Sequence, residues 1–177
     1  MIVFDSASHT YTNSENGRIY ISTTTLLGEY KAKFDALFHS KRVAAREGVS
    51  QEFVLEMWQA ENKKATDKGT AIHKLLENYI ADGTEVESYY WLYRAYDKVM
   101  MHIVDKYKSV KTENLLHNHE YEIAGTTDLI FEQGNYFTLS DFKTNKKFRY
   151  ASDYHEYFQE PISHLSYCEF NDYSLQL

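Results

Sequence analysis

The chain has 177 residues, of which 43% are hydrophobic and 25% are charged, and it contains a single proline. This composition excludes a disordered chain, and the length suits one compact domain with its own hydrophobic core. The net charge of −7 argues against a grip on nucleic acid that uses the whole surface, so any basic contact would have to be local.

The compartment is indicated by what the sequence lacks. One cysteine, Cys168, excludes a framework of internal disulfides and is typical of a reducing compartment, where we expect it to be buried and inert. No run approaches the roughly 18 apolar residues of a membrane helix, and the N-terminus has no basic region followed by an apolar stretch. We therefore expect a cytoplasmic protein that does not contact membranes.

The first two thirds of the chain are predicted to form a β-hairpin followed by helices. Residues 3–12 and 18–23 are rich in Thr, Tyr and Ile and flank NSENG, a turn-forming sequence. Apolar spacing and capping residues then predict helices over residues 26–38, 51–65, 69–81 and 87–108. In the helix over 69–81, His73 and Glu77 are four residues apart and lie together on the flank of the apolar stripe. In the last of these helices, we expect Tyr89, Leu92, Tyr93, Tyr96, Met100, Ile103 and Tyr107 on the buried side.

After Thr112 the apolar spacing changes to two, which predicts strands. The sequences HEYEI, TTDLIFE and YFTLSDFK are expected to form a meander, with Gly125 separating the first two and QGNY turning the second into the third. We interpret His117 and His119 as surface histidines. Asp172 is expected to cap a last helix that begins at Tyr173.

The last two strands bring acidic residues together. Asp141 and Lys143 alternate onto one face of their strand, and Phe142 points the other way. If Gly134 and Asn135 form a two-residue loop, Asp128 lies directly opposite Asp141.

Two opposed carboxylates are destabilising unless something compensates their charge. A divalent cation, Mg²⁺ or Mn²⁺, would convert this repulsion into coordination. Lys143 would then lie beside the metal, where its ammonium can orient or help deprotonate an attacking water. These residues predict hydrolysis of a phosphodiester.

Three motifs occur in order in this sequence: GTAIHKLLE, IAGTTD and LSDFKTNK. They resemble the G-x-x-x-H-x-x-x-E, G-x-x-D and D-x-K motifs of the RecB-like branch of the PD-(D/E)xK nuclease superfamily. The resemblance covers about residues 69–146, and the N-terminal hairpin is weakly similar to the opening of some phage-borne members.

This resemblance implies a role for each matching residue. The implied metal ligands are His73, Asp128, Asp141 and, as a candidate fourth, the carbonyl of Phe142; Lys143 is the implied catalytic lysine, supported by Glu77. The family continues with a helix that carries Q-x-x-x-Y, and Gln176 would be its substrate-contacting glutamine. The chain ends before the tyrosine of that motif, so we expect this helix to be cut short.

The implied fold is α/β of the restriction-endonuclease type, with a central mixed sheet flanked by helices. We expect one nuclease domain over residues 1–177, with a peripheral hairpin and helix at 1–38 and a C-terminally incomplete catalytic core at 66–177.

The implied function is that of a Mg²⁺- or Mn²⁺-dependent deoxyribonuclease. We expect an exonuclease that acts on DNA ends or single strands in recombination, repair or phage DNA processing, in host cytoplasm if phage-encoded, with a helicase or recombination protein as partner. Within KTNKKFR, Lys146, Lys147 and Arg149 are assigned to phosphate contacts, although a solvated charge run gives the same pattern. Two alternatives stay open: a non-catalytic nuclease-fold module that binds DNA or protein, and a phosphohydrolase of small nucleotides.

Overall fold

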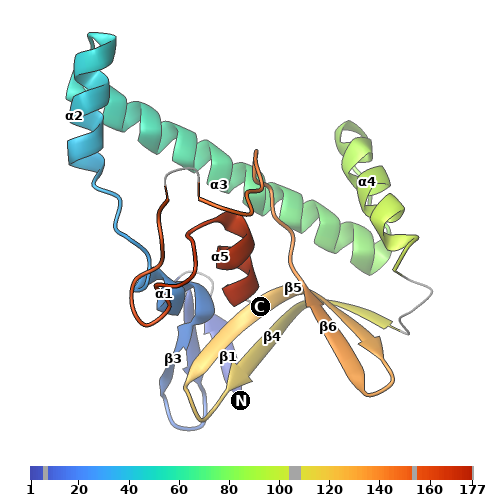
Figure 1. Cartoon of the computed structure of the whole chain (residues 1–177). Helices are drawn as coiled ribbons and strands as arrows, with labels where there is room; N and C mark the ends of the chain where they lie inside the picture. The colour runs from blue at the N-terminus through green and yellow to red at the C-terminus, as the bar shows by residue number, and fades with distance from the viewer. Residues whose placement is uncertain (6–7, 104–108, 153–154, 177) are drawn as a thin grey trace.

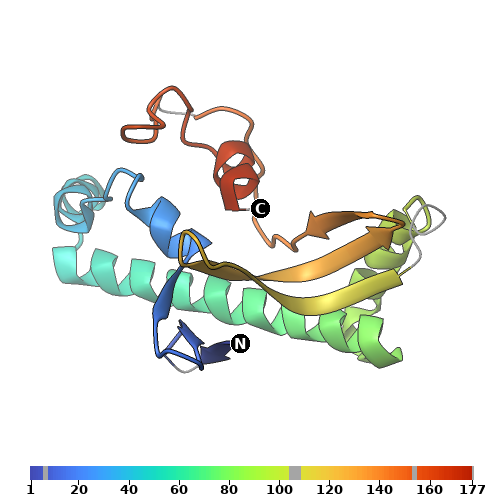
Figure 2. The same cartoon turned by 90° about the horizontal axis from the view of Figure 1, so that it is seen from below.

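The computed structural model describes residues 1–5, 8–103, 109–152 and 155–176, and it has α/β architecture. Figure 1 shows a mixed sheet crossed by one long helix, and Figure 2 shows that helix, α3, along one face of the sheet with α5 on the opposite side. The strands are β1 Ile2–Asp5, β2 Thr10–Asn13, β3 Ile19–Ser22, β4 Ser109–Asn118, β5 Ile123–Gln133 and β6 Tyr136–Ser140. The helices are α1 Thr23–Gly28, α2 Ala36–Glu47, α3 Gln51–Asp82, η1 Glu87–Tyr89, α4 Tyr90–Met100 and α5 Glu169–Gln176.

The N-terminal strands belong to the main sheet, which corrects the expectation of a peripheral hairpin. The segment predicted as one strand over 3–12 is two antiparallel strands, β1 and β2, separated by a turn in which His9 has a φ of 52°. β2 pairs with β3 as predicted, and β3 then pairs in parallel with the start of β5, Ile21 facing Ile123. The described strands are ordered β1-β2-β3-β5-β4, and β6 also pairs with β5.

The helix predicted over 26–38 is replaced by two shorter helices. Ser22 caps α1, its Oγ accepting the Thr25 N–H at 3.0 Å, and α1 ends at Gly28. A new helix, α2, begins only after Asp35, whose side chain accepts the Phe38 N–H at 2.8 Å. A capping side chain satisfies backbone donors that a helix start leaves open, so each cap fixes a separate start.

In contrast, the two helices predicted over 51–65 and 69–81 are one continuous helix, α3, of 32 residues. Ser50 caps its start, and Gly83, with a φ of 77°, ends it. Gly69 lies inside the helix, where a Cβ would come within 3.4 Å of Thr144 Oγ1. The glycine therefore marks a close approach between α3 and the chain after β6.

The amphipathic helix predicted over 87–108 ends earlier than expected. A short 3₁₀ turn, η1, leads into α4, which ends at Met100, and residues 104–108, with Tyr107, lie outside the described ranges. Its predicted buried side is confirmed by Leu92, Tyr93 and Met100, which are at most 9% exposed. These side chains pack with residues of α3 and β5 in the main core.

The strand arrangement after residue 108 differs from the predicted meander in one place. HEYEI was expected to be a strand, but the strand is β4, which ends at Asn118. Asn118 then turns the chain, since its side chain accepts the N–H groups of Glu120 and Tyr121 at 2.9 and 3.0 Å. Gly125 lies within β5 and does not break it.

The β5–β6 hairpin has the predicted register. Gln133 pairs with Tyr136 across a loop that contains Gly134 with a φ of 60°, and the pairing runs back to Leu129 opposite Ser140. Asp128 and Asp141 are the next residues in that register. Cys168 is buried, as expected, and none of the helices in the described ranges is long and apolar enough to cross a membrane.

Candidate active site at a split sheet edge

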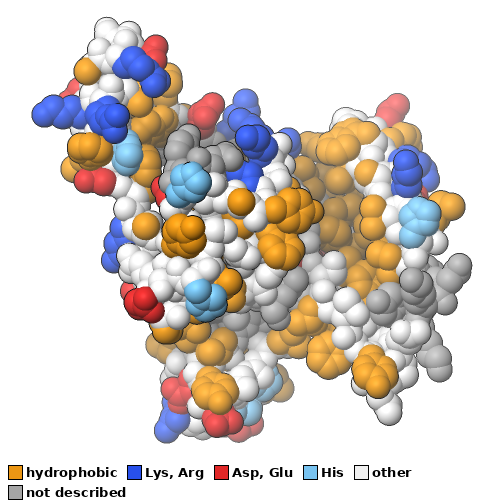
Figure 3. Space-filling model, viewed as in Figure 1, with side chains coloured by type: hydrophobic (Ala, Val, Ile, Leu, Met, Phe, Trp, Pro, Cys, Tyr) orange, Lys and Arg blue, Asp and Glu red, His pale blue; other side chains and the backbone are white. Residues whose placement is uncertain are grey.

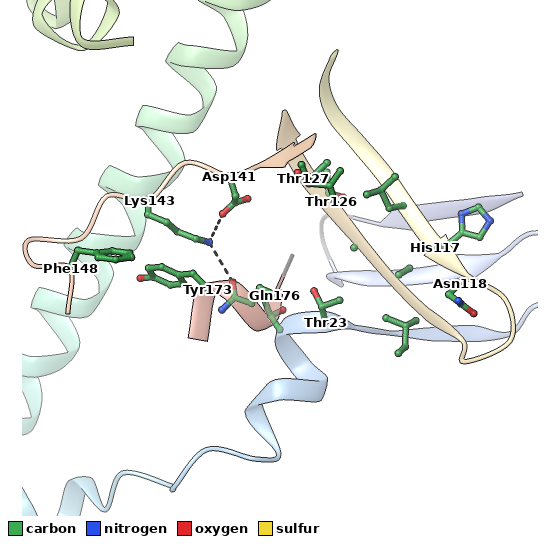
Figure 4. A pocket seen from close by; sticks show the side chains of 16 residues that line it. Thr23, His117, Asn118, Thr126, Thr127, Asp141, Lys143, Phe148, Tyr173 and Gln176 are labelled. Carbon is green, nitrogen blue, oxygen red and sulfur yellow. Dashed lines mark hydrogen bonds and ion pairs between the residues drawn. The ribbon is translucent and has the colours of Figure 1, made fainter. Parts of the chain in front are cut away.

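One edge of β5 is shared by two strands that do not meet. β3 pairs with it as far as Ala124, and β6 pairs with it from Leu129 onwards. The chain leaves the sheet at both places, into α1 at Thr23 and into a loop after Ser140. A cavity of about 480 Å³ opens at this split, lined by residues 125–127 of β5 and by the side chains of α1, α5 and the loop that Figure 4 shows.

Asp128, which is 11% exposed, is held from two directions beside this split. His73 of α3 contributes its Nδ1 at 3.0 Å from Asp128 Oδ1, and the backbone N–H of Phe142 donates to Oδ2 at 2.5 Å. Burial by itself raises the pKa of Asp128, but the hydrogen bonds from His73 and Phe142 outweigh it and hold the pKa below its usual value. The same hydrogen bond raises the pKa of His73, so the pair favours an imidazolium beside a carboxylate.

Asp141 lies just beyond the end of β6 and forms an ion pair with Lys143. Burial raises the pKa of Asp141, and the negative charge of Asp128 raises it further. Lys143 acts in the opposite direction without outweighing the other two. The opposite pKa shifts of Asp128 and Asp141 are what two neighbouring carboxylates with unequal hydrogen bonding should have.

Lys143 lies outside the strand, which corrects the prediction of a strand through residue 143. Its Nζ contacts Asp141, lies 3.4 Å from Gln176 Oε1 and sits 4.6 Å from the ring centroid of Tyr173 (Figure 4). The Tyr173 hydroxyl in turn donates to Asn145 Oδ1 at 2.6 Å. The ammonium is therefore positioned by β6 on one side and by α5 on the other.

The last helix starts earlier than the sequence predicted. α5 begins at Glu169, so Asp172 is not its cap but forms an ion pair with Lys31 at 2.7 Å. Gln176, the predicted substrate contact, lies at the end of α5 with its Oε1 toward Lys143 and its Nε2 donating to Asp172 at 3.2 Å.

Phe142 points away from Asp141 and Lys143, as predicted. Its ring packs into the core formed by α3 and α4 and lies edge-on to the His73 ring, with 5.9 Å between centroids. Asp141 and Lys143 line the cavity at the split instead. The atom of Phe142 that contacts the site is its backbone N–H, whereas the resemblance implied its carbonyl.

A second hollow, of about 1,010 Å³, borders His73 and Asp128 on their other side and contains two glutamates. Glu77 forms an ion pair with Lys74 at 2.7 Å, on the surface of α3. Glu113 was not singled out from the sequence. Thr112 faces Leu129 and Asn114 faces Thr127, so the register puts Glu113 opposite Asp128.

Glu113 carries two signs of an unusual position. Its backbone is left-handed, with a φ of 50°, and burial raises the pKa of its carboxyl, helped by the charges of Asp128 and Glu77. The signal in the sequence would have been the β4–β5 register, which required β4 to be recognised as a strand.

The three predicted phosphate contacts lie on the loop between β6 and α5. Lys146 and Lys147 are exposed and line a groove beside α3 together with Arg149. Arg149 is also tied to α5: its Nε and Nη2 donate to the two oxygens of Glu169 at 2.7 and 2.6 Å. A phosphate would compete with Glu169 for Arg149 but not for the Lys146 side chain.

The implied metal ligands are near one another, but both carboxylates already have partners. Two carboxylates and an imidazole are chemically suited to a divalent cation. As placed, however, Asp128 bonds His73 and Asp141 bonds Lys143, and the described part of the chain contains no group of three His, Cys, Asp or Glu side chains gathered as a metal site. The donor set fits a cation in kind, and binding one requires His73 and Lys143 to release their carboxylates.

His117 and His119 lie away from this centre, at the far end of the cavity in the case of His117 (Figure 4). Their Nε2 atoms are 3.1 Å apart, and His119 Nδ1 is 2.7 Å from the Tyr20 hydroxyl.

Comparisons with models of protein families, with curated proteins and with solved structures find no match to this chain.

Proposed function

We propose that this protein is a metal-dependent nuclease of the RecB-like PD-(D/E)xK type, with a restriction-endonuclease-like core, and that it cleaves DNA phosphodiester bonds. The observation that carries the proposal is the split edge of β5. There Asp128 and Asp141 lie just past the last pair of the β5–β6 register, Leu129 opposite Ser140, and His73 contacts Asp128 while Lys143 contacts Asp141. Nothing in the packing of the sheet requires two carboxylates at this place, since like charges in opposed positions cost stability.

In this proposal Asp128, Asp141 and His73 would hold Mg²⁺ or Mn²⁺, which would supply Lewis-acid chemistry at the phosphate. Lys143, once released from Asp141, carries a positive charge to the phosphate oxygens and orients the attacking water. Gln176 and Tyr173 limit where that ammonium can move, because they contact it from α5. The Phe142 N–H donates a hydrogen bond to Asp128 Oδ2, which orients this carboxylate and favours its ionised form.

The test is cleavage of linear single-stranded and duplex DNA in Mn²⁺ or Mg²⁺. Asp128→Ala and Lys143→Ala should each reduce the rate by about 100-fold or more, the size expected when a positioned catalytic group is removed. Lys98→Ala, an exposed change on α4 outside both hollows, is the matched control and should cleave at the wild-type rate. Full activity in both site variants, or no cleavage by the wild-type chain, would refute the proposal.

The alternative is a non-catalytic module of the same fold that binds DNA or a partner protein, such as a helicase or recombination protein. The observation that favours it is that His73 and Lys143 already neutralise the two carboxylates without any metal. Thermal unfolding with Mn²⁺ separates the two. Metal held by the native site should stabilise the protein by about 2.7 kcal/mol at a concentration 100 times the dissociation constant, and a metal-free module should not respond.

A further inference from the structure

A basic groove runs beside the proposed site, between the N-terminal half of α3 and the loop after Asp141. Its volume is about 950 Å³, and five basic side chains line it: Lys64, Lys68, Lys146, Lys147 and Arg149. Figure 3 shows Lys and Arg side chains gathered near the middle of the face in view, where this loop lies over α3. This local charge contrasts with the net charge of −7 for the whole chain.

Two acidic side chains also line the groove, Glu61 and Glu169. Glu169 is occupied by the two-pronged ion pair with Arg149, and Glu61 is the other acidic side chain in the lining. Lys64 and Lys68 are one helical turn apart and so project from the same face of α3. Lys63, by contrast, pairs with Asp67 at 2.7 Å and is absent from the groove lining.

The groove is continuous with the proposed site. Both Gly69 and Thr144 line it, and Thr144 Oγ1 would be 3.4 Å from a Cβ built on Gly69, so α3 and the loop are in contact there. Lys143 precedes Thr144, and His73 lies one turn after Gly69 on α3. A linear polymer bound along the groove would therefore reach Lys143 and His73.

Trp58, also in the lining, adds a surface of a different kind. It is partly exposed, and its ring offers a face on which an unpaired base can stack. Lysines along a groove follow a phosphate backbone, and an aromatic ring beside them contributes only when the bases are free of a duplex.

We infer that this groove binds single-stranded nucleic acid, with Lys64, Lys68, Lys146 and Lys147 on its phosphates and Trp58 against a base, and guides it to Lys143. The role of the groove in guiding a strand to Lys143 rests on the proposed function. The binding itself does not depend on cleavage, so the two can fail separately.

The experiment measures binding of a fluorescein-labelled oligo-dT of about twelve nucleotides by anisotropy, in EDTA and at several NaCl concentrations. Two double variants, Lys64→Gln/Lys68→Gln and Lys146→Gln/Lys147→Gln, remove charge from the two walls of the groove. Each should weaken binding at least about tenfold and reduce the slope of log K against log salt by about 1.4, the value for two phosphate contacts on a single strand.

The matched control is Lys41→Gln/Lys98→Gln, which removes the same charge from α2 and α4, outside the groove lining. It should bind within about twofold of the wild-type chain with an unchanged slope. Unchanged binding in both groove variants would overturn the inference, as would equal losses in the control, which would show attraction by the protein as a whole. A duplex that binds more tightly than the single strand would also overturn it.

A second measurement depends on Trp58 itself. The chain has two tryptophans, so Trp91→Phe leaves Trp58 as the sole tryptophan reporter. Oligo-dT should quench its fluorescence with the same midpoint as the anisotropy, and an unchanged emission at saturation would contradict the stacking contact. Oligo-dT binding that is lost in the groove variants, in a chain that cleaves no DNA in Mn²⁺, would support the groove and refute the nuclease proposal alone.

Discussion

The two edges of β5 are built differently. Along one edge β4 pairs from Ser109 opposite Glu132 to Asn118 opposite Ile123. Along the other edge β3 covers only the start and β6 only the end, and residues 125–128 lie between them. A paired edge satisfies backbone groups and supports packed side chains, whereas a split edge leaves space that polar side chains from elsewhere can enter. One strand therefore supplies both the stable part of the fold and one wall of the candidate site.

The doubly paired end of β5 should be the most sensitive to loss of packing. Phe131 pairs with Val110 on one side and Thr138 on the other, and its side chain is 3% exposed in a core with Met100 and Leu129. Phe131→Ala should lower the free energy of unfolding by about 3–5 kcal/mol, because it removes a buried ring and leaves a cavity. Urea unfolding followed by circular dichroism measures this loss.

The control for Phe131 is Phe137→Ala, on the neighbouring strand β6, where the side chain is 66% exposed. It should cost less than about 1 kcal/mol. Equal losses in the two variants would show that the paired end of β5 is not the stable part of the sheet.

The opening at the split edge is bounded by α5, and the ion pair between Arg149 and Glu169 is one of the contacts that hold α5 in place. Arg149 hydrogen bonds lower the pKa of Glu169 to about 2, from 4.5, and the Glu169 side chain is 15% exposed. Because the pKa is lower in the folded state, the stabilisation is present above pH 4.5 and is lost as the pH falls toward about 2. Glu169→Gln should therefore cost about 1–2 kcal/mol near neutral pH, discounted for the partial exposure of Arg149, and roughly half as much near pH 3.

Thermal melts of the wild type and Glu169→Gln at about pH 7 and pH 3 test this. Glu120→Gln, on the exposed turn after β4, serves as the control and should change little at either pH. A difference between wild type and Glu169→Gln that is as large at low pH as at neutral pH would contradict the assignment of the effect to the ionised carboxylate.

The same contrast between the edges explains what the sequence could and could not predict. A two-residue loop at Gly134 and Asn135 fixes the register of β5 and β6 by local rules, so the opposition of Asp128 and Asp141 was predictable. β4 also joins β5 through a short turn, between Asn118 and Ile123, but its polar sequence does not alternate and HEYEI was taken as the strand instead, so β4 and the position of Glu113 were missed. Local chemistry predicts a hairpin, but it does not predict which strands meet across a sheet.

The predicted ends of some helices and strands were wrong because they depend on contacts between residues that are far apart in the sequence. Gly125 was interpreted as a break, yet it lies within β5, where a Cβ would make an ordinary contact with Thr23 Oγ1 of α1 at 3.5 Å. Gly69 similarly lies within α3 where Thr144 approaches. The start of α5 depends on Arg149, which is 20 residues before Glu169. Each of these depends on a residue distant in sequence, which no local pattern contains.

The smallest expected effect concerns the charge at the split itself. Asp141 has a raised pKa because of burial and the neighbouring charge of Asp128, so its ionised form destabilises the fold as the pH rises above 3.8. Asp141→Asn removes that repulsion and also removes the ion pair with Lys143. The net change near neutral pH should be a gain of up to about 1 kcal/mol in the free energy of unfolding without metal.

Lys143→Gln keeps both carboxylates and removes only the compensating charge, so it should lower stability by a similar amount. Parallel urea titrations in EDTA measure the two signs. If both variants are less stable than the wild type, the ion pair between Asp141 and Lys143 contributes more to stability than the repulsion between Asp128 and Asp141 costs. The split edge would then be stabilised by the same ion pair that metal binding in the proposed function has to break.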